Sequence, residues 1–292
     1  MTFREALNRG KLYLMECGIE EYELDAWLLF EHVTGINKAM YYVKDREELP
    51  EDQERKYQEM LHRRGEHIPL QHLTGVQEFM GYSFRVNGNV LIPRQDTEIL
   101  VEDADAFCHV MEGQGRNIRI LDLCTGSGCI LLSLMKMDSH GSRSGIGSDL
   151  SEEALRIARE NQKILEVSKE KAAFIKSDLF EEITGRFDMI VSNPPYIRTK
   201  EIEKLQEEVR LHDPFQALDG KEDGLYFYQR ITERASDFLN DEGRLIFEIG
   251  YDQGEAVSAM MKDAGFDSVY VKKDLAGLDR VVGGVYNRAR EN

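Results

Sequence analysis

The stretch FDMIVSNPPYIR, residues 187–198, joins a short apolar run to an unusual polar sequence. The apolar run predicts a strand in the middle of a parallel sheet, because such strands are buried on both faces. It is followed by Asn193, Pro194, Pro195 and Tyr196. Consecutive prolines cannot donate hydrogen bonds to a strand ladder, so we expect the strand to end here and these residues to have another purpose.

These residues suit an acceptor nitrogen that is planar and conjugated, as in a carboxamide or the exocyclic amine of a base. The side-chain oxygen of Asn193 and the backbone carbonyl of Pro194, which Pro195 holds in a fixed direction, could accept its two N–H bonds. Tyr196 offers a flat face for stacking. We predict that Asn193, Pro194 and Tyr196 are catalytic and that all four residues bind substrate, acting by positioning and electrostatics. A rigid loop is the purely structural alternative.

A second candidate site is a small-residue loop after a predicted strand at 118–123. The loop consists of Cys124, Thr125, Gly126, Ser127 and Gly128. Such a loop lets the backbone approach a ligand, and the N-terminus of the next helix presents free N–H groups. The next predicted strand, 144–149, ends on Asp149, whose carboxylate could accept bonds from both ribose hydroxyls. Together these features predict a nucleoside site; a structural tight turn is the alternative.

The ligand predicted for this loop is S-adenosylmethionine rather than a dinucleotide. The GxGxxG fingerprint needs a third glycine, but Leu131 stands at that position. Asp122, directly before the loop, disfavours a pyrophosphate and suits a cationic ligand. Asp178 ends the third predicted strand, where the adenine would lie, although a helix N-cap explains this residue equally well in isolation.

Alternating strands and helices position these residues. The predicted strands span 118–123, 144–149, 172–177, 187–193, 243–250, 267–274 and 279–287. Their alternation with helical segments predicts an α/β, Rossmann-like domain with a mostly parallel sheet and helices on both faces. We expect the strand before Asn193 to lie beside the strand before the glycine loop, so that both ends face one crevice.

The first 75 residues are predicted to form a small helical bundle, with helices in 2–18, 21–35 and 49–65. This bundle carries no catalytic signature, so it is either a scaffold or a surface that recognises a macromolecule. Alternating residues on either side of Asn87-Gly88 predict a β-hairpin. The expected domains are a helical domain at 1–75, a hairpin linker at 76–93 and a catalytic domain at 94–292.

Composition limits the other possibilities. Lys and Arg number 37 against 54 Asp and Glu, and the net charge of −17 argues against broad nucleic-acid binding. The four cysteines form no CxxC pair and the seven histidines no zinc-finger spacing, so we expect reduced thiols and no metal. The apolar runs are too short to cross a bilayer and the N-terminus lacks a signal-peptide core, which predicts a cytoplasmic protein without a membrane segment.

Taken together, the motifs resemble those of the release factor glutamine methyltransferases. This family methylates the glutamine of the Gly-Gly-Gln motif in bacterial class I peptide chain release factors. Residues 69–102 resemble the family's hairpin and its Ile-Pro-Arg-x-x-Thr-Glu signature. DLCTGSG, SNPPYI, DPFQALDGKEDGL at 213–225 and DLAGLDRVVGG at 274–284 then follow in the family's order.

The resemblance implies a seven-stranded methyltransferase domain that uses S-adenosylmethionine and releases S-adenosylhomocysteine. It implies that residues 124–128, Asp149, Leu179 and Asn193 contact the cofactor, and that residues 193–196 hold the substrate glutamine. The helical domain would engage the release factor. The expected partners are therefore class I release factors, without direct nucleic-acid contact, and the chain is expected to be a monomer.

Three positions depart from the family pattern. Cys124 replaces a usual glycine, which a negative φ would allow. Gln95 and Asp96 replace the usual Pro and Glu of the signature. Three other functions stay open: methylation of an exocyclic base amine, whose enzymes can share Asn-Pro-Pro-Tyr, methylation of a ribosomal protein glutamine, and a non-enzymatic module that keeps the fold for binding.

Overall fold

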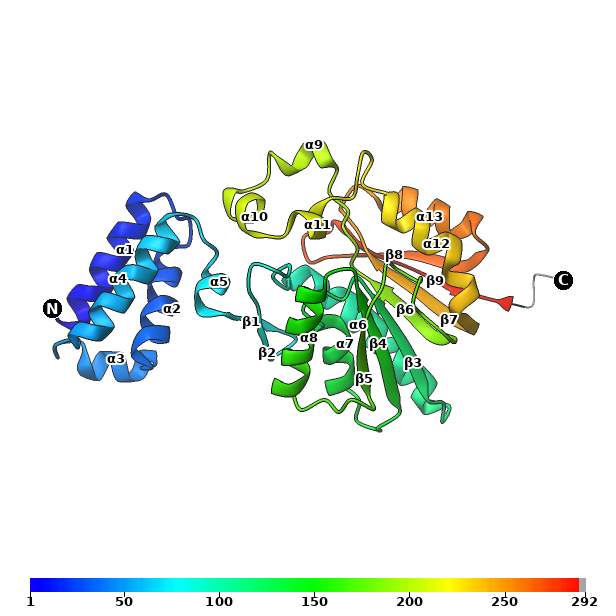
Figure 1. Cartoon of the computed structure of the whole chain (residues 1–292), viewed down its shortest axis with the longest axis horizontal. Coiled ribbons are helices and arrows are strands. Elements are labelled where there is room, and N and C mark those ends of the chain that lie inside the picture. The colour runs from blue at the N-terminus through cyan, green and yellow to red at the C-terminus, as the bar shows by residue number, and fades with distance from the viewer. Residues whose placement is uncertain (289–292) are drawn as a thin grey trace. The chain divides into compact units, whose positions relative to one another are not determined.

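The structure is a computed structural model that describes residues 1–288, and the chain divides into two compact units. The helical unit contains Met1–Val76 together with Gln206–His212, and the sheet unit contains the rest of the chain. Residues 206–212 were not predicted to belong with the N-terminal helices. Figure 1 shows residues 1–76 in blue to cyan, residues 206–212 (α10) in yellow-green, and the rest of the chain from cyan-green to red.

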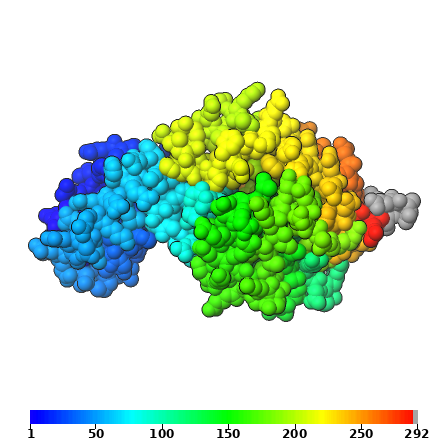
Figure 2. Space-filling model, viewed as in Figure 1, coloured from blue at the N-terminus to red at the C-terminus, as the bar shows by residue number. Residues whose placement is uncertain are grey.

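The helical unit is a bundle with one aromatic core. Its helices are α1 (Phe3–Glu16), α2 (Tyr22–Thr34), α3 (Lys38–Lys44), α4 (Glu51–Gly65), α5 (Leu70–Thr74) and α10 (Glu207–His212). A capping box between Thr2 and Glu5 starts α1, and Gly35 in the left-handed conformation ends α2. Phe30 is fully buried at the centre, in edge-to-face contact with neighbouring rings. Figure 2 shows the outer face of residues 1–76 of this unit in blue to cyan.

The sheet unit is built on a seven-stranded sheet of order β5-β4-β3-β6-β7-β9-β8. The strands are β3 (Ile118–Leu123), β4 (Arg143–Asp149), β5 (Ala172–Lys176), β6 (Phe187–Ser192), β7 (Leu239–Glu248), β8 (Phe266–Lys273) and β9 (Asp279–Tyr286). The first five strands in this order are parallel, and β9 runs antiparallel to both β7 and β8. The predicted α/β class is confirmed, as is the pairing of β6 with β3.

Helices cover both faces of this sheet (Figure 1). One face packs on α6 (Glu98–Gly113), α7 (Cys129–Lys136) and α8 (Glu152–Ile164), and the other on α12 (Tyr226–Phe238) and α13 (Gly254–Asp263). Within β3, Ile120 faces the first core while Leu121 faces the second. A strand buried on both faces needs apolar residues at successive positions, which explains the continuous apolar runs of the sequence.

The predicted hairpin exists, but its turn was placed wrongly. It pairs β1 (Val76–Phe79) with β2 (Tyr82–Arg85), so the turn is Met80-Gly81 rather than Asn87-Gly88. Both turn residues have positive φ, as a two-residue hairpin turn requires, and the N–H of Met80 donates to Glu98 at 2.7 Å. Residues 87–93 form no strand, and several of them line the pocket described in the next section.

Two further short helices follow β6, namely α9 (Thr199–Ile202) and α11 (Phe215–Leu218), and the 3-10 turn η1 (Gln95–Thr97) precedes α6. Within residues 1–288, none of the helices combines the length and apolar character that a membrane crossing requires. No cluster of three or more His, Cys, Asp or Glu side chains in this part of the chain could hold a metal ion.

Candidate functional site

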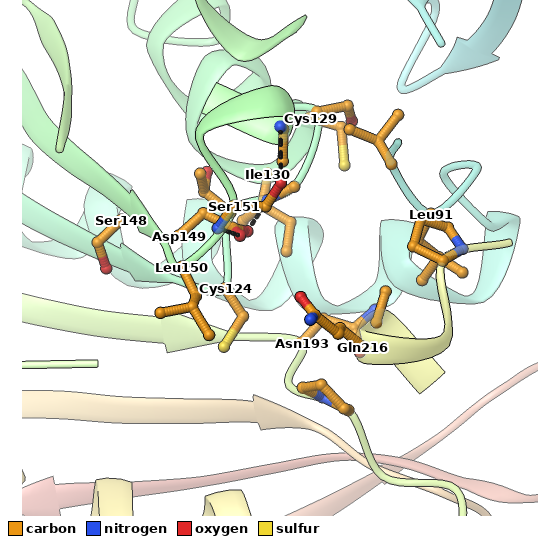
Figure 3. Close-up of a pocket in the computed structure, with 18 of the residues that line it drawn as sticks. Leu91, Cys124, Cys129, Ile130, Ser148, Asp149, Leu150, Ser151, Asn193 and Gln216 are labelled. Atoms are coloured by element: carbon orange, nitrogen blue, oxygen red, sulfur yellow. Dashed lines mark hydrogen bonds between the residues drawn. The ribbon is translucent and has the colours of Figure 1, made fainter. Parts of the chain in front are cut away.

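The candidate site is a pocket at the carboxyl ends of the parallel strands β3, β4, β5 and β6. Parallel strands end at the same edge of the sheet, so loops far apart in the sequence meet there. The pocket is lined by Asn89, Val90, Leu91, Pro93, Arg94, Thr97, Cys124, Thr125, Gly126, Ser127, Cys129, Ile130, Ser148, Asp149, Leu150, Ser151, Ala154, Ser177, Asp178, Leu179, Asn193, Pro195, Pro214, Gln216, Ala217 and Phe227. Figure 3 shows Asn193, Gln216 and Leu91 around the same cavity as Asp149 and Ser151.

The glycine loop forms the floor of this pocket. The amide of Asn161 holds it in place from α8, by donating to the Ser127 carbonyl at 2.9 Å. Gly128 has φ of 79°, and an added Cβ would lie 3.1 Å from the Phe174 ring, so both conformation and space favour glycine. The loop therefore has the small residues that close approach of a ligand requires, as predicted.

Cys124 contradicts one expectation. Its φ is +59°, in the left-handed region, whereas tolerance of cysteine at this position was predicted to need negative φ. Leu179, also in the pocket wall, has φ of +51°. A non-glycine residue in this region costs about 1–2 kcal/mol in conformational energy, so the surrounding structure must hold it in this conformation. Two such residues therefore face the same ligand pocket.

Asp149, at the end of β4, is held by the loops on both sides. One carboxylate oxygen accepts from Gly126 N–H and the other from Ser151 N–H, each at 2.9 Å. Burial raises the pKa of the carboxyl, while these backbone bonds counteract that effect. Each carboxylate oxygen can accept a further hydrogen bond, so the side chain fits a pair of vicinal hydroxyls.

Asp122 lies underneath the glycine loop and is not part of the pocket wall. It is fully buried, and its Oδ2 accepts from the Thr125 hydroxyl at 2.5 Å. Burial raises its pKa to about 7. Any influence of this carboxyl on a cationic ligand therefore passes through the loop rather than through contact.

Asp178 lines the pocket after β5, in line with its predicted place. The chain beyond it forms turns, so the alternative of a helix N-cap is wrong. One carboxylate oxygen accepts from the Arg230 guanidinium at 3.0 Å. This ion pair leaves the second oxygen of Asp178 available for a ligand.

Among the four residues after β6, Asn193 and Pro195 line the pocket, while Pro194 and Tyr196 do not. The Asn193 amide donates to the Thr97 hydroxyl at 3.3 Å, and no hydrogen bond from the described residues reaches its Oδ1 oxygen. The Pro194 carbonyl likewise accepts no backbone hydrogen bond within residues 1–288. Both predicted acceptors are thus open.

Tyr196 is oriented differently from the prediction of a stacking ring. Its ring packs on the second core of the sheet, and its hydroxyl donates to Glu248 at 3.5 Å. Its carbonyl accepts from the side chain of Gln253 at 3.1 Å. The backbone beyond it is held by a bond from Ile197 N–H to the Leu218 carbonyl at 3.0 Å. Tyr196 therefore anchors the loop that presents Asn193.

Sequence reasoning missed two walls of the pocket. One is the segment 89–97, of which residues 89–93 were expected to belong to the hairpin, and the other is the segment 214–217. Both segments lie in stretches that resemble family signatures, but no residue type in them indicated a ligand contact. Phe227, which lines the pocket from α12, had no signal of its own.

Comparison with known families finds two matching family models. Residues 5–75 match the PrmC N-terminal domain and residues 101–273 match the methyltransferase small domain. The chain is 37% identical over 284 residues to a release factor glutamine methyltransferase of Geobacter sulfurreducens, covering 97% of this chain and 96% of the relative. It is 39% identical over 281 residues to that of Agrobacterium fabrum, covering 96% of each.

Solved structures share the fold of the sheet unit. The catalytic domain of hMettl16, in complex with the MAT2A 3′UTR hairpin 6, has a TM-score of 0.56 at 14% identity and covers 75% of this chain and 81% of its own. The Thermus thermophilus 16S rRNA N2 G1207 methyltransferase, with AdoMet and guanosine, has a TM-score of 0.50 at 18% identity and covers 73% of this chain and 50% of its own. At these identities the likeness concerns the fold alone.

Proposed function

Because this chain belongs to the release factor glutamine methyltransferase family, we propose that it methylates the glutamine of the Gly-Gly-Gln motif in class I peptide chain release factors. The enzyme is an S-adenosylmethionine-dependent protein-glutamine methyltransferase. The observation that carries the proposal is the open amide oxygen of Asn193, in the wall of a pocket that also contains Asp149 and the glycine loop.

S-adenosylmethionine supplies an electrophilic methyl group when it is bound. Asp149 would hold its ribose hydroxyls, and the loop of residues 124–128 would lie against it. Leu179 and Asp178 would border the adenine. The Ser127 hydroxyl, which is buried in the pocket wall, supports this arrangement. Among the described residues, only the thiol of the neighbouring Cys129 is close enough to interact with it.

The substrate amide would be oriented by two neutral acceptors. Asn193 Oδ1 and the Pro194 carbonyl would each accept one N–H bond, so that the weak lone pair of the amide nitrogen points at the methyl group. Neutral acceptors suit this task, because they orient the amide without holding a competing charge beside it. The nitrogen becomes strongly acidic as it gains the methyl group, so solvent can take its proton.

Pro195 would contribute an apolar surface beside the substrate amide, since it lines the pocket. Tyr196 would act from behind the loop by keeping Asn193 and Pro194 in place. Its partly buried ring, packed on the second core, and its bond to Glu248 support that role. The catalytic contribution of Tyr196 is therefore proposed to be positional.

The helical unit is proposed to select the protein substrate. One glutamine side chain is too small for selection, and specific protein recognition needs an interface of roughly 1,200 Å² or more. The helix α3 supports the proposal, because Tyr42 and Val43 are 77% and 74% exposed there. Exposed aromatic and aliphatic side chains of this kind commonly form protein interfaces.

Asn193→Ala tests the proposed function. Labelled S-adenosylmethionine is offered with an intact class I release factor, with a short Gly-Gly-Gln peptide, or with DNA or RNA. We expect the wild-type enzyme to label the intact factor far faster than the peptide, and Asn193→Ala to lower kcat by about a hundredfold or more. The control is Asn117→Ala, because Asn117 is exposed before β3, at the opposite end of the strand.

Two results would contradict the proposal. Labelling of nucleic acid but not of the release factor would place the enzyme among base methyltransferases. Turnover of Asn193→Ala within about threefold of wild type would remove the role given to the amide oxygen.

A further inference from the structure

The amide of Asn193 has two ends of similar size, and only one of them suits the proposed reaction. Its oxygen can accept from the substrate, whereas its NH₂ group would meet the substrate N–H bonds donor to donor. Something in the protein must therefore distinguish the two orientations of this side chain. The contact that does so is the bond from Asn193 Nδ2 to the Thr97 hydroxyl at 3.3 Å.

Thr97 is in an unusual position for a threonine at the start of a helix. It is the N-cap of α6 and is 3% exposed, yet its side chain makes no capping hydrogen bond. A threonine at an N-cap ordinarily accepts from a backbone N–H in the first turn. Its hydroxyl is therefore not used by the helix and faces Asn193 instead.

A hydroxyl alone does not select an orientation, because it can donate as well as accept. The neighbouring carboxyl removes that freedom. Glu248, at the end of β7, is 2% exposed, and its Oε2 has no hydrogen-bond partner within residues 1–288. The Thr97 hydroxyl lies close enough to lower the pKa of Glu248, against the burial that raises it to about 7.

We propose that Thr97 and Glu248 are positioning residues that fix the amide oxygen of Asn193 toward the substrate. In this proposal Glu248 Oε2, which no other donor among the described residues reaches, takes the hydroxyl hydrogen of Thr97, and Thr97 is left with only a lone pair to offer Asn193. The NH₂ end of Asn193 is thereby held at Thr97, and Oδ1 faces the pocket. This inference rests on the proposed function, in which Oδ1 accepts from the substrate amide.

The carboxyl of Glu248 also contacts Tyr196, the last residue of the segment 193–196, which we call the substrate loop. Glu248 Oε1 accepts from the Tyr196 hydroxyl, and the proposed bond from Thr97 would connect the same buried side chain of β7 to Asn193. A buried polar group that is shared in this way is costly to leave unpaired, which makes the arrangement specific. Burial has the largest effect on the pKa of Glu248 and raises it to about 7, while the Thr97 hydroxyl and the charge of Arg280 lower it.

Thr97→Val and Thr97→Ser test this inference in the full-length enzyme with an intact release factor. Valine keeps the shape but removes the hydroxyl, and we expect kcat to fall about tenfold to a hundredfold with KM for the factor within about twofold. Serine keeps the hydroxyl and should restore kcat to within about threefold of wild type. If Thr97 serves only packing, serine should be the more harmful change, which would overturn the proposal.

A cycle with Asn193→Ala provides the specific readout. Once the amide is absent, adding Thr97→Val should change kcat less than about twofold, because the two residues act through one contact. A further loss of tenfold or more in the double variant would show that Thr97 acts independently of Asn193, against the proposal.

One measurement does not depend on turnover, so it separates failure of this inference from failure of the proposed function. Nuclear magnetic resonance of the full-length protein follows exchange of the Asn193 side-chain amide protons with solvent. Slow exchange in wild type and Thr97→Ser, with faster exchange in Thr97→Val, supports the contact even if no release factor is methylated. Equal exchange in all three proteins would refute it.

Discussion

Replacing Asp149 by alanine is expected to abolish most of the binding of S-adenosylmethionine. In the structure each oxygen of this carboxylate already accepts one backbone N–H at 2.9 Å, from Gly126 and from Ser151. The two ribose hydroxyls of the cofactor would add one bond to each oxygen. Charge-assisted bonds of this kind contribute about 1.5–3 kcal/mol each, so losing both costs about 3–6 kcal/mol.

Since every 1.4 kcal/mol changes Kd about tenfold, the variant should bind the cofactor roughly a hundredfold to ten-thousandfold more weakly. This range counts the ribose bonds alone; Gly126 N–H and Ser151 N–H also lose their acceptor in the same substitution, which would weaken binding further. Titration calorimetry of wild type and Asp149→Ala measures the difference directly. Asp263→Ala is the matched control, because Asp263 is exposed at the end of α13 and outside the pocket.

Thermal unfolding without cofactor shows whether the loop has merely collapsed. We expect Asp149→Ala to unfold within a few degrees of wild type, and to lose the rise in Tm that S-adenosylmethionine gives the wild-type protein. A Kd within about threefold of wild type would refute the reasoning, because neither hydroxyl bond could then involve Asp149.

Two further predictions concern buried charges. Asp122 has its pKa raised to about 7 by burial, so folding favours its protonated form, and this stability is present below about pH 4 and lost as pH rises through 7. The free energy of unfolding of wild type minus that of Asp122→Asn should therefore fall by up to about 4 kcal/mol between pH 4 and 8 in urea titrations without cofactor, and a constant difference would contradict the shifted pKa. Arg143 is buried between Asp105 at 2.6 Å and Glu112 at 2.7 Å, so Arg143→Met should cost about 3–5 kcal/mol in urea unfolding. Exposed Arg156→Met is the control, and a loss below about 1 kcal/mol for Arg143→Met would mean that the pairs are not the source of stability.

The parallel strands were predictable because their environment leaves a local signal. Residues 118–123 were expected as a strand and form β3, and β6 ends within one residue of its predicted end. A strand covered by helices on both faces needs apolar side chains at almost every position, so a short run of apolar residues is enough to predict it. The carboxyl-end residues Asp149 and Asn193 could then be placed at one edge of the sheet from topology rules alone.

The hairpin was placed wrongly because turn preference and tertiary context disagreed. Asn87-Gly88 has the stronger local preference for a two-residue turn, but the chain turns at Met80-Gly81. A hydrogen bond from Met80 N–H to Glu98 supports that turn from 18 residues away. No sequence pattern within the hairpin indicates that Glu98 accepts this hydrogen bond.

The place of residues 206–212 was not predictable for a similar reason. This segment joins the helical unit, where Glu208 pairs with Arg64 at 2.5 Å and Arg64 also pairs with Asp25 at 2.6 Å. In the sequence, Arg64 is a basic residue near the end of a predicted helix, which is a common and unspecific feature. Ion pairs between distant segments depend on the tertiary fold, so no periodic pattern in the sequence predicts them.

The acidic residues of the site also show what the sequence can predict and what only the structure reveals. Asp122 and Asp149 each stand at or beside the end of a buried strand. The sequence predicted that Asp149 binds the ribose and that Asp122 suits a cationic ligand, but not that Asp122 lies outside the pocket wall. The structure separates them by one layer, because the glycine loop covers Asp122 and leaves Asp149 in the pocket wall. Glu248 had no predicted role at all, although its burial and its contact with Tyr196 set it beneath the substrate loop. Residue type and spacing therefore predict which chemistry a site can perform, whereas the packing around each carboxyl decides which one lines the pocket and which one has its pKa raised by burial to about 7.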